Sequence, residues 1–212
     1  AVIMMWGLGE PVGALTANLT GWLQGMREGS IVVLAIIMGL MLAFDMGGPV
    51  NKVAYAFMLI CVSQGVYSVV AIAAVGIAVP PLGMGLATLI GRKYFTAEER
   101  ETGKAALVMG CVGVTEGAIP FAAADPLRVI PANMIGAASG CVTAALMGAQ
   151  CYAGWGGLIV LPVVQGKLGF VAALLVGACV SAACVILLKA FAKKKPTNVA
   201  TDDELDLDFE IN

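Results

Sequence analysis

Residues 105–124 read AALVMGCVGVTEGAIPFAAA, an apolar stretch that is interrupted at its centre by Glu116, Gly117 and Pro120. An α-helix rises about 1.5 Å per residue, so each half of the stretch reaches only about halfway across a bilayer core of about 30 Å. The chain must then return to the side from which it entered. We therefore predict a re-entrant hairpin with Glu116 at its tip.

Two uninterrupted apolar segments follow this hairpin. Residues 129–149 and 168–188 carry no charge and are long enough to cross a bilayer, so each is predicted to span it. Between them, residues 153–166 (AGWGGLIVLPVVQG) form a shorter apolar run, which we expect on the opposite face of the membrane.

The segments upstream of the hairpin are less regular. Residues 12–26 alternate polar and apolar side chains at helical spacing, which is typical of an interfacial helix. Residues 29–44 are apolar but short for a span. No charge occurs in residues 53–91, which leaves two alternatives: two tight crossings, or one crossing and a piece broken at Pro80 and Pro81.

The composition indicates the protein class. Of 212 residues, 60% are hydrophobic and 12% are charged, whereas a soluble domain carries about 25% charged residues. We therefore expect an all-α integral membrane protein, a multi-spanning helical transporter with broken helices. The net charge of −2 gives no sign of a nucleic-acid partner.

The chain contains no histidine and six cysteines. The missing histidine excludes a phosphohistidine carrier, a His-ligated metal centre and any Ser-His or Cys-His catalytic pair within these residues. The cysteines lie in apolar runs without CxxC spacing, which favours small packing residues over disulfides or ligands. We expect neither a bound metal nor a cofactor.

The charges that do occur are concentrated in two places. Seven lie in residues 92–104 and nine lie after Ala192, and both segments are rich in Lys and Arg. Basic segments beside membrane spans face the cytoplasm, so we place both there. Residues 1–191 then form the membrane part, and residues 192–212 form an acidic, disordered cytoplasmic tail.

Polar residues at membrane depth are hypotheses about function, and one group follows the apolar residues 29–44. The sequence DMGGPVNK contains Asp45, Asn51 and Lys52 on either side of a Gly-Gly-Pro break that cannot continue a helix. Freed backbone groups are tolerated in a membrane where they line a cavity, so these side chains are candidate binding residues. The alternative is that Asp45 and Lys52 form a structural pair.

The second group lies at the hairpin tip, where Thr115, Glu116 and Pro120 are candidate binding residues. A carboxylate there can accept hydrogen bonds from sugar hydroxyls and act as the base for a hydroxyl undergoing phosphorylation, so Glu116 is the candidate catalytic residue. Its alternative role is to cap a half-helix or pair with a lysine. Asp125 and Arg128 favour an ion pair at the hairpin exit.

Small and aromatic residues indicate function less specifically than the polar groups do. Gly136 with Gly140, and Gly177 with Ser181, have the spacing that lets helices approach closely, either within one chain or in a homodimer. Three aromatic side chains flank the polar groups and suggest interfacial anchors or surfaces for sugar stacking. They are Phe121, Tyr152 and Trp155.

The motifs FDMGGPVNK (44–52) and GVTEGAIPF (113–121) resemble the fructose family of phosphotransferase-system IIC permeases, and GLGEPVGALT (7–16) strengthens the resemblance. It extends over essentially the whole chain, which looks like the C-terminal part of such a permease. The resemblance implies a multi-pass protein of the bacterial inner membrane with a cytoplasmic C-terminus.

The resemblance also implies a mechanism. Phosphate passes from phosphoenolpyruvate to a IIA histidine and a IIB cysteine, and IIB phosphorylates the fructose-like sugar held by IIC. Glu116 would contact the sugar hydroxyls, while Asp45, Asn51 and Lys52 would line or support the site. The expected partners are the sugar, IIB, IIA, membrane lipid and a second copy of the chain.

This mechanism requires alternating access. We expect the hairpin at residues 105–124 to move relative to a static dimer scaffold, with residues 92–104 as a docking surface, a hinge or simply a solvated loop. An ion-coupled secondary sugar transporter is the main alternative, with Asp45 and Glu116 as coupling carboxylates. A membrane scaffold or receptor and a membrane hydrolase are weaker ones.

Overall fold

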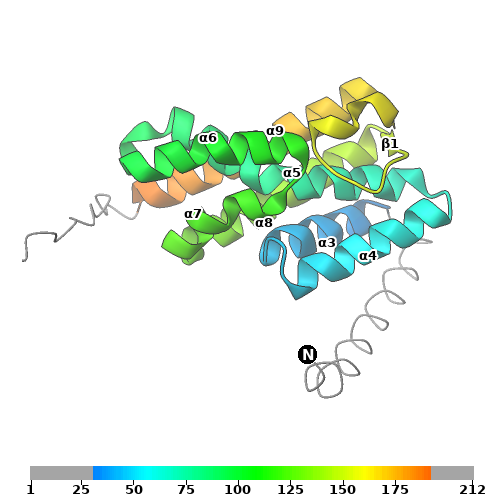
Figure 1. The fold of residues 1–212 in the computed structure, drawn as a ribbon, viewed down its shortest axis with the longest axis horizontal. Helices are drawn as coiled ribbons and strands as arrows, with labels where there is room; N and C mark the ends of the chain where they lie inside the picture. Colours follow the sequence, from blue (N-terminus) through cyan, green and yellow to red (C-terminus); the bar gives the residue numbers. More distant parts are fainter. Residues whose placement is uncertain (1–30, 192–212) are drawn as a thin grey trace, which may run out of the picture.

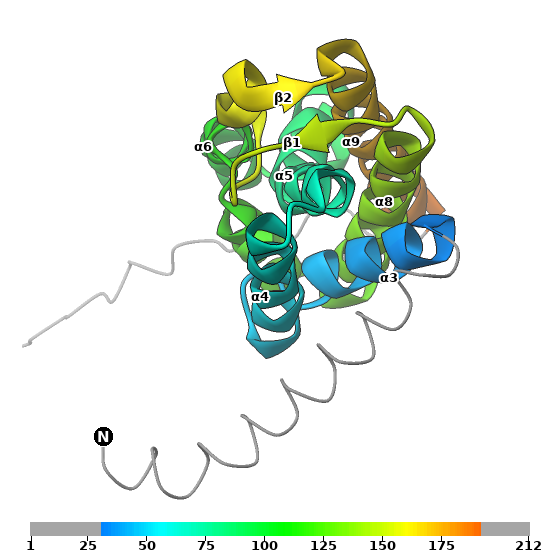
Figure 2. The ribbon, with the colours of Figure 1, turned by 90° about the vertical axis from the view of Figure 1, so that its right-hand side faces the viewer.

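Helix α5 (Tyr67–Ile90) is the axis of the fold in this computed structural model, which describes residues 31–191. Its side chains are apolar all round, so most of them are buried among the neighbouring helices. Figure 2 shows α5 enclosed by the other helices in the view along the long axis of the molecule. These are α3 (Ile31–Phe44), α4 (Pro49–Ser63), α6 (Ala97–Val112), α8 (Pro126–Leu146) and α9 (Lys167–Phe191).

Three helices within residues 31–191 are long and apolar enough to cross a membrane, namely α5, α8 and α9. The last two are the long apolar helices expected at residues 129–149 and 168–188, and the all-α membrane fold is confirmed with them. Helices α3 and α4 are apolar but shorter. The interfacial helix predicted at residues 12–26 and the tail at 192–212 lie outside the described residues.

Of the two alternatives for residues 53–91, the one with a break at Pro80 and Pro81 is wrong, because α5 continues through both prolines. Proline lacks an N–H, so Pro81 leaves the carbonyl of Ile77 without its helical donor. The hydroxyl of Thr115 replaces that donor with a hydrogen bond of 3.0 Å to the Ile77 oxygen. The chain breaks earlier instead, after α4, where Gly65 adopts a φ of +73°.

The interrupted stretch folds as a helix, a break and a short returning helix. Helix α6 ends at Gly113, whose φ is +86°, and the chain continues through the 3₁₀ turn η2 (Thr115–Ala118) into α7 (Ile119–Ala124). In Figure 1 the chain follows α6 to this break and returns along α7 towards the end where α6 began. The hairpin connectivity follows the prediction, and its re-entry into a membrane stays a prediction.

The charged segment at residues 92–104 is more ordered than a solvated loop. Helix α6 begins at Ala97, because Thr96 and Glu99 form a capping box that satisfies backbone donors of the first turn. The preceding residues form the 3₁₀ turn η1 (Arg92–Tyr94). At the hairpin exit, Asp125 and Arg128 form the predicted ion pair.

The seam between α8 and α9 is built from small residues. A Cβ added at Gly136 would lie 2.8 Å from the carbonyl oxygen of Gly177, and one added at Gly140 would lie 3.2 Å from the Gly177 Cα. Ser181 packs against Gly136 and is fully buried. The small-residue spacing therefore serves packing within the chain, and these faces are closed to a second copy.

The apolar run at residues 153–166 contains no α-helix. It includes the 3₁₀ segment η3 (Leu158–Val163) and the strand β2 (Val164–Gln165). This strand pairs antiparallel with β1 (Gln150–Cys151), which precedes the run, and Gln150 lies opposite Gln165. Figure 1 places this segment at the opposite end of the molecule from the start of α6, as the opposite-face prediction requires. Loop glycines and Pro162 prevent a continuous helix here.

A buried ion pair joins α9 to α6. The Lys189 Nζ lies 2.9 Å from Glu99 Oε1, and the two side chains are only 12% and 18% exposed. The same ammonium group lies 4.1 Å from the ring centre of Phe95, which is fully buried. The last turn of the long span is thereby fixed to the first turn of the hairpin.

We expect Lys189→Met to lower stability by about 2 kcal/mol, because the carboxylate of Glu99 then stays largely buried without its partner. This corresponds to a fall of about 5 °C in the melting temperature of the purified protein. Lys167→Met is the matched control, since Lys167 is exposed at the other end of α9. Equal melting temperatures for the two variants would contradict the role assigned to the pair.

Candidate functional site

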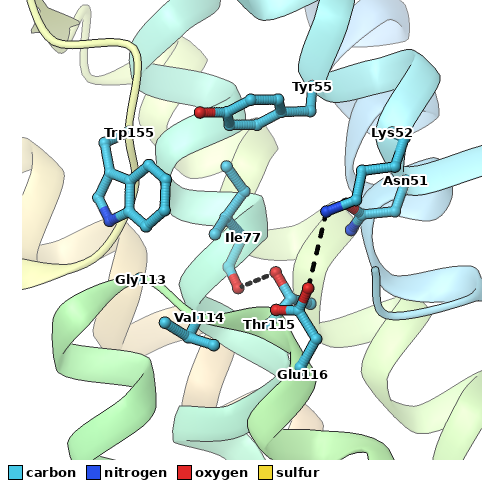
Figure 3. Close-up of a pocket in the computed structure, with 9 residues that line it drawn as sticks. All are labelled: Asn51, Lys52, Tyr55, Ile77, Gly113, Val114, Thr115, Glu116 and Trp155. Carbon is cyan, nitrogen blue, oxygen red and sulfur yellow. Dashed lines mark hydrogen bonds and ion pairs between the residues drawn. The ribbon is translucent and has the colours of Figure 1, made fainter. Parts of the chain in front are cut away.

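A cavity of about 340 Å³ lies where α4, α5 and the hairpin tip meet, and its volume is within the range of small-molecule sites. Figure 3 shows side chains from four separate segments of the chain around it. The lining residues are Asn51, Lys52, Tyr55, Ile77, Gly113, Val114, Thr115, Glu116 and Trp155.

Two opposite charges lie next to each other on one side of this cavity. The Lys52 Nζ on α4 lies 3.7 Å from Glu116 Oε1 on the hairpin tip (Figure 3). Their side chains are 64% and 43% exposed, so the pair itself contributes little to stability. Both groups are left open to a polar ligand, which can donate to the carboxylate and accept from the ammonium group.

Asp45 fixes the start of α4, on which Lys52 is carried. Its carboxylate accepts hydrogen bonds from the backbone N–H groups of Val50 at 2.7 Å and Asn51 at 2.9 Å. These are donors of the first helical turn, which have no partner within the helix. Asp45 therefore acts as a cap for the broken helix.

The break before α4 also approaches the hairpin tip. Gly47 has a φ of +113°, a conformation that favours glycine, and a Cβ added there would lie 2.7 Å from Glu116 Oε1. The backbone at Gly47 thus forms a wall against the carboxylate. This contact requires glycine both for its backbone angle and for its missing side chain.

Asn51 anchors α4 to the end of α3. Its Nδ2 donates a hydrogen bond of 2.6 Å to the carbonyl oxygen of Leu42, and the side chain is buried. That carbonyl lies in the last turn of α3, where helical acceptors lack partners. Asn51 lines the cavity while one of its polar atoms is already committed to the fold.

An aromatic wall closes the side of the cavity opposite Lys52 and Glu116. The Trp155 Nε1 donates a 2.7 Å hydrogen bond to the carbonyl of Val112, and the Tyr55 hydroxyl donates a 3.0 Å bond to the carbonyl of Gly154. The Tyr55 and Trp155 rings meet edge to face, with centroids 6.3 Å apart (Figure 3). Ring faces and edges of this kind suit the apolar C–H surface of a sugar.

The structure brings together four of the six predicted binding residues: Asn51, Lys52, Thr115 and Glu116 line the cavity. Asp45 and Pro120 do not line it. The alternative pair between Asp45 and Lys52 does not form, because Asp45 accepts backbone donors and Lys52 reaches Glu116.

The three aromatic residues predicted to flank the site lie in different parts of the structure. Trp155 lines the cavity, whereas Phe121 is buried in the core and Tyr152 packs on Tyr67 at 4.4 Å between ring centres. Sequence reasoning missed Tyr55 as a site residue. Its signal was present, because Tyr55 lies one helical turn after Asn51 and therefore faces the same way.

The cysteines behave as packing residues. All six lie within residues 31–191 and none of them forms a disulfide there, and three of them are buried. No group of three or more metal-binding side chains occurs within residues 31–191.

Comparison with known proteins finds relatives of this sequence. The chain is 79% identical over its whole length to the fructose-like permease IIC component 2 of Escherichia coli, of which it spans 59%. It is 48% identical to the PTS system fructose-specific EIIB'BC component of Xanthomonas campestris over 88% of the chain and 33% of that protein. It is 37% identical to the PTS system fructose-specific EIIC component of Haloferax volcanii over 95% of the chain and 54% of that protein.

The chain therefore spans about half of the length of the IIC relatives and a third of the fused one. No protein-family profile matches it, and no solved structure matches it.

Proposed function

Because this chain belongs to the fructose family of phosphotransferase-system IIC components, we propose that it forms the sugar-binding part of a membrane permease. The sugar would be fructose or a close analogue, phosphorylated by a IIB partner during uptake. The observation that carries this proposal is the cavity in which Lys52 and Glu116 face an aromatic wall. The 79% identity to a fructose-like IIC component supports it.

Each wall of the cavity has a role in this chemistry. The Glu116 carboxylate accepts hydrogen bonds from sugar hydroxyls and takes the proton from the hydroxyl that attacks phosphorus. The Lys52 ammonium group attracts the carboxylate and holds it turned into the cavity. The rings of Tyr55 and Trp155 pack on the less polar face of the sugar.

The phosphoryl group itself would come from outside this chain. The sequence has no histidine to carry it, and in several relatives the IIC part is fused to IIB, as the name EIIB'BC states. We propose that IIB, supplied in turn by IIA, approaches from the cytoplasmic side of a bacterial inner membrane. Residues 1–191 would then be the membrane part and residues 192–212 its cytoplasmic tail.

Movement of the hairpin would give alternating access. The tip is held to α5 by the bond from Thr115 to Ile77 and to the loop after β1 by the bond from Trp155 to Val112. A displacement of the tip would have to break these two hydrogen bonds together with the packing of Gly117 against Met109 and Pro81. The packed pair α8 and α9 would remain static.

The experiment combines vesicles containing the full-length permease with its IIB partner, phosphoenolpyruvate, the general phosphotransferase proteins and labelled fructose. We expect labelled sugar phosphate to form inside the vesicles only when phosphoenolpyruvate and IIB are both present. An imposed proton or sodium gradient is the control, and it should give no uptake by itself. Accumulation of unmodified sugar under such a gradient would establish the ion-coupled alternative instead.

A further inference from the structure

A second cavity, of about 160 Å³, lies where α5 ends and α6 begins, outside the proposed sugar site. Its walls combine cationic and apolar side chains from both helices and from η1. The lining residues that matter here are Thr88, Leu89, Arg92, Arg100, Glu101 and Lys104.

The cavity carries more positive than negative charge. Arg92, Arg100 and Lys104 face a single carboxylate, that of Glu101, which lies 2.7 Å from the Lys104 Nζ. The guanidinium of Arg100 is held in place by two hydrogen bonds to the carbonyl of Phe95, at 3.1 and 2.9 Å. A fixed guanidinium beside further cations suits a phosphate group, which accepts several hydrogen bonds at once.

Of the three cations that line this cavity, Arg92 is the one whose side chain has no polar partner within residues 31–191. Within residues 31–191 its side chain forms neither an ion pair nor a hydrogen bond, although it is exposed at the cavity. Lys93, its neighbour on η1, lies over the ring of Tyr94 at 4.9 Å and does not line the cavity. Arg92 is therefore available to an anion in the cavity, whereas Lys93 is a surface cation outside it.

Apolar side chains continue from the cavity along the outside of the molecule. Leu89 lines the cavity and is 48% exposed, and Ile90 beside it is 68% exposed. On α6, Val108 and Val112 follow Lys104 at intervals of four residues, so the three share one helix face, and both valines are exposed. A soluble anion would make no contact with these apolar side chains, whereas the acyl chain of a lipid could pack against them.

We propose that this cavity binds the phosphate headgroup of an anionic phospholipid, with the acyl chains lying along Leu89, Val108 and Val112. The cations gather at one end of spanning helix α5, where a headgroup layer would meet the protein. The proposal rests on the membrane fold and on these contacts, and it does not depend on which sugar the first cavity binds.

Native mass spectrometry of the purified full-length permease tests the proposal. The protein is titrated with phosphatidylglycerol and, in parallel, with the zwitterionic phosphatidylcholine. We expect phosphatidylglycerol to bind more tightly and the double variant Arg92→Gln, Lys104→Gln to weaken its binding about 30-fold, which is about 1 kcal/mol for each cation removed. Both side chains are exposed, so the melting temperature without lipid should stay unchanged.

Lys93→Gln is the matched control for the single variant Arg92→Gln, because both remove one charge from η1. Only Arg92→Gln should weaken binding. Equal weakening by both would show diffuse surface attraction and overturn the proposal, as would equal binding of the two lipids. Displacement of the lipid by inorganic phosphate would assign the cavity to a soluble anion. Unchanged lipid binding with a raised KM for phosphorylated IIB would assign it to a protein partner.

Discussion

Replacing Glu116 by glutamine is expected to lower the rate of sugar phosphorylation at least about 100-fold, the lower end of what a positioned general base contributes. Glutamine has nearly the same shape, but its amide is neutral, takes no proton from a sugar hydroxyl and loses the attraction to Lys52 across 3.7 Å. The measurement is formation of labelled fructose phosphate by the full-length permease with IIB and phosphoenolpyruvate.

Glu98→Gln is the control for this variant, because Glu98 is an exposed carboxylate in the first turn of α6, away from the cavity. It should phosphorylate sugar at the parent rate. Glu116 is itself half exposed, so both variants should fold normally. If the Glu116→Gln variant binds and phosphorylates sugar as the parent does, the cavity is not the reaction site. That result would favour the alternative that the protein is a membrane scaffold or receptor.

Gly47→Ala is expected to reduce the same phosphorylation rate about 100-fold, although Gly47 contributes no functional group. The added Cβ would lie 2.7 Å from Glu116 Oε1 and must displace the carboxylate, and a misplacement of about 1 Å is enough for such a loss. The variant should also lose about 1–3 kcal/mol of stability, because its φ of +113° strains an L-residue. Phosphorylation and thermal unfolding are measured on the same preparation.

Gly65→Ala is the control that separates backbone strain from displacement of the Glu116 carboxylate. Gly65 also has a positive φ, of +73°, yet a Cβ added there meets nothing within 4 Å. It should lose about 1 kcal/mol of stability while keeping its phosphorylation rate. If Gly47→Ala unfolds earlier but retains the parent rate at a temperature where it is folded, the contact with Glu116 does not position the carboxylate.

Unbroken spans were predictable because only length and apolarity decide them. Residues 129–149 and 168–188 appear as α8 and α9, since their apolar length outweighs the one local signal against a helix, Pro131 near the start of α8. The continuation of α5 through Pro80 and Pro81 was not predictable in the same way. Their cost to α5 is offset by a hydrogen bond from Thr115, which lies far away in the sequence, and no local pattern reports such a donor.

The residues of the candidate site were predictable only in part, because the sequence shows local breaks but not distant contacts. Breaks at membrane depth identified Lys52 and Glu116, and these two side chains do meet. The same signal could not separate a side chain that faces a ligand from one that holds the break, so Asp45 was placed in the site although it caps α4. Ile77 gave no signal, because an apolar residue in an apolar helix looks the same whether it faces a core or a cavity.

The seam between α8 and α9 has a consequence for how this chain can change over evolution. At Gly136 and Gly140 size alone is under selection, because even a methyl group meets the facing backbone. On the outward faces, as at Leu175 in the middle of α9, which is 60% exposed, no facing backbone limits the size of the side chain. Substitutions among descendants should accumulate on the outer faces, while the line of glycines persists.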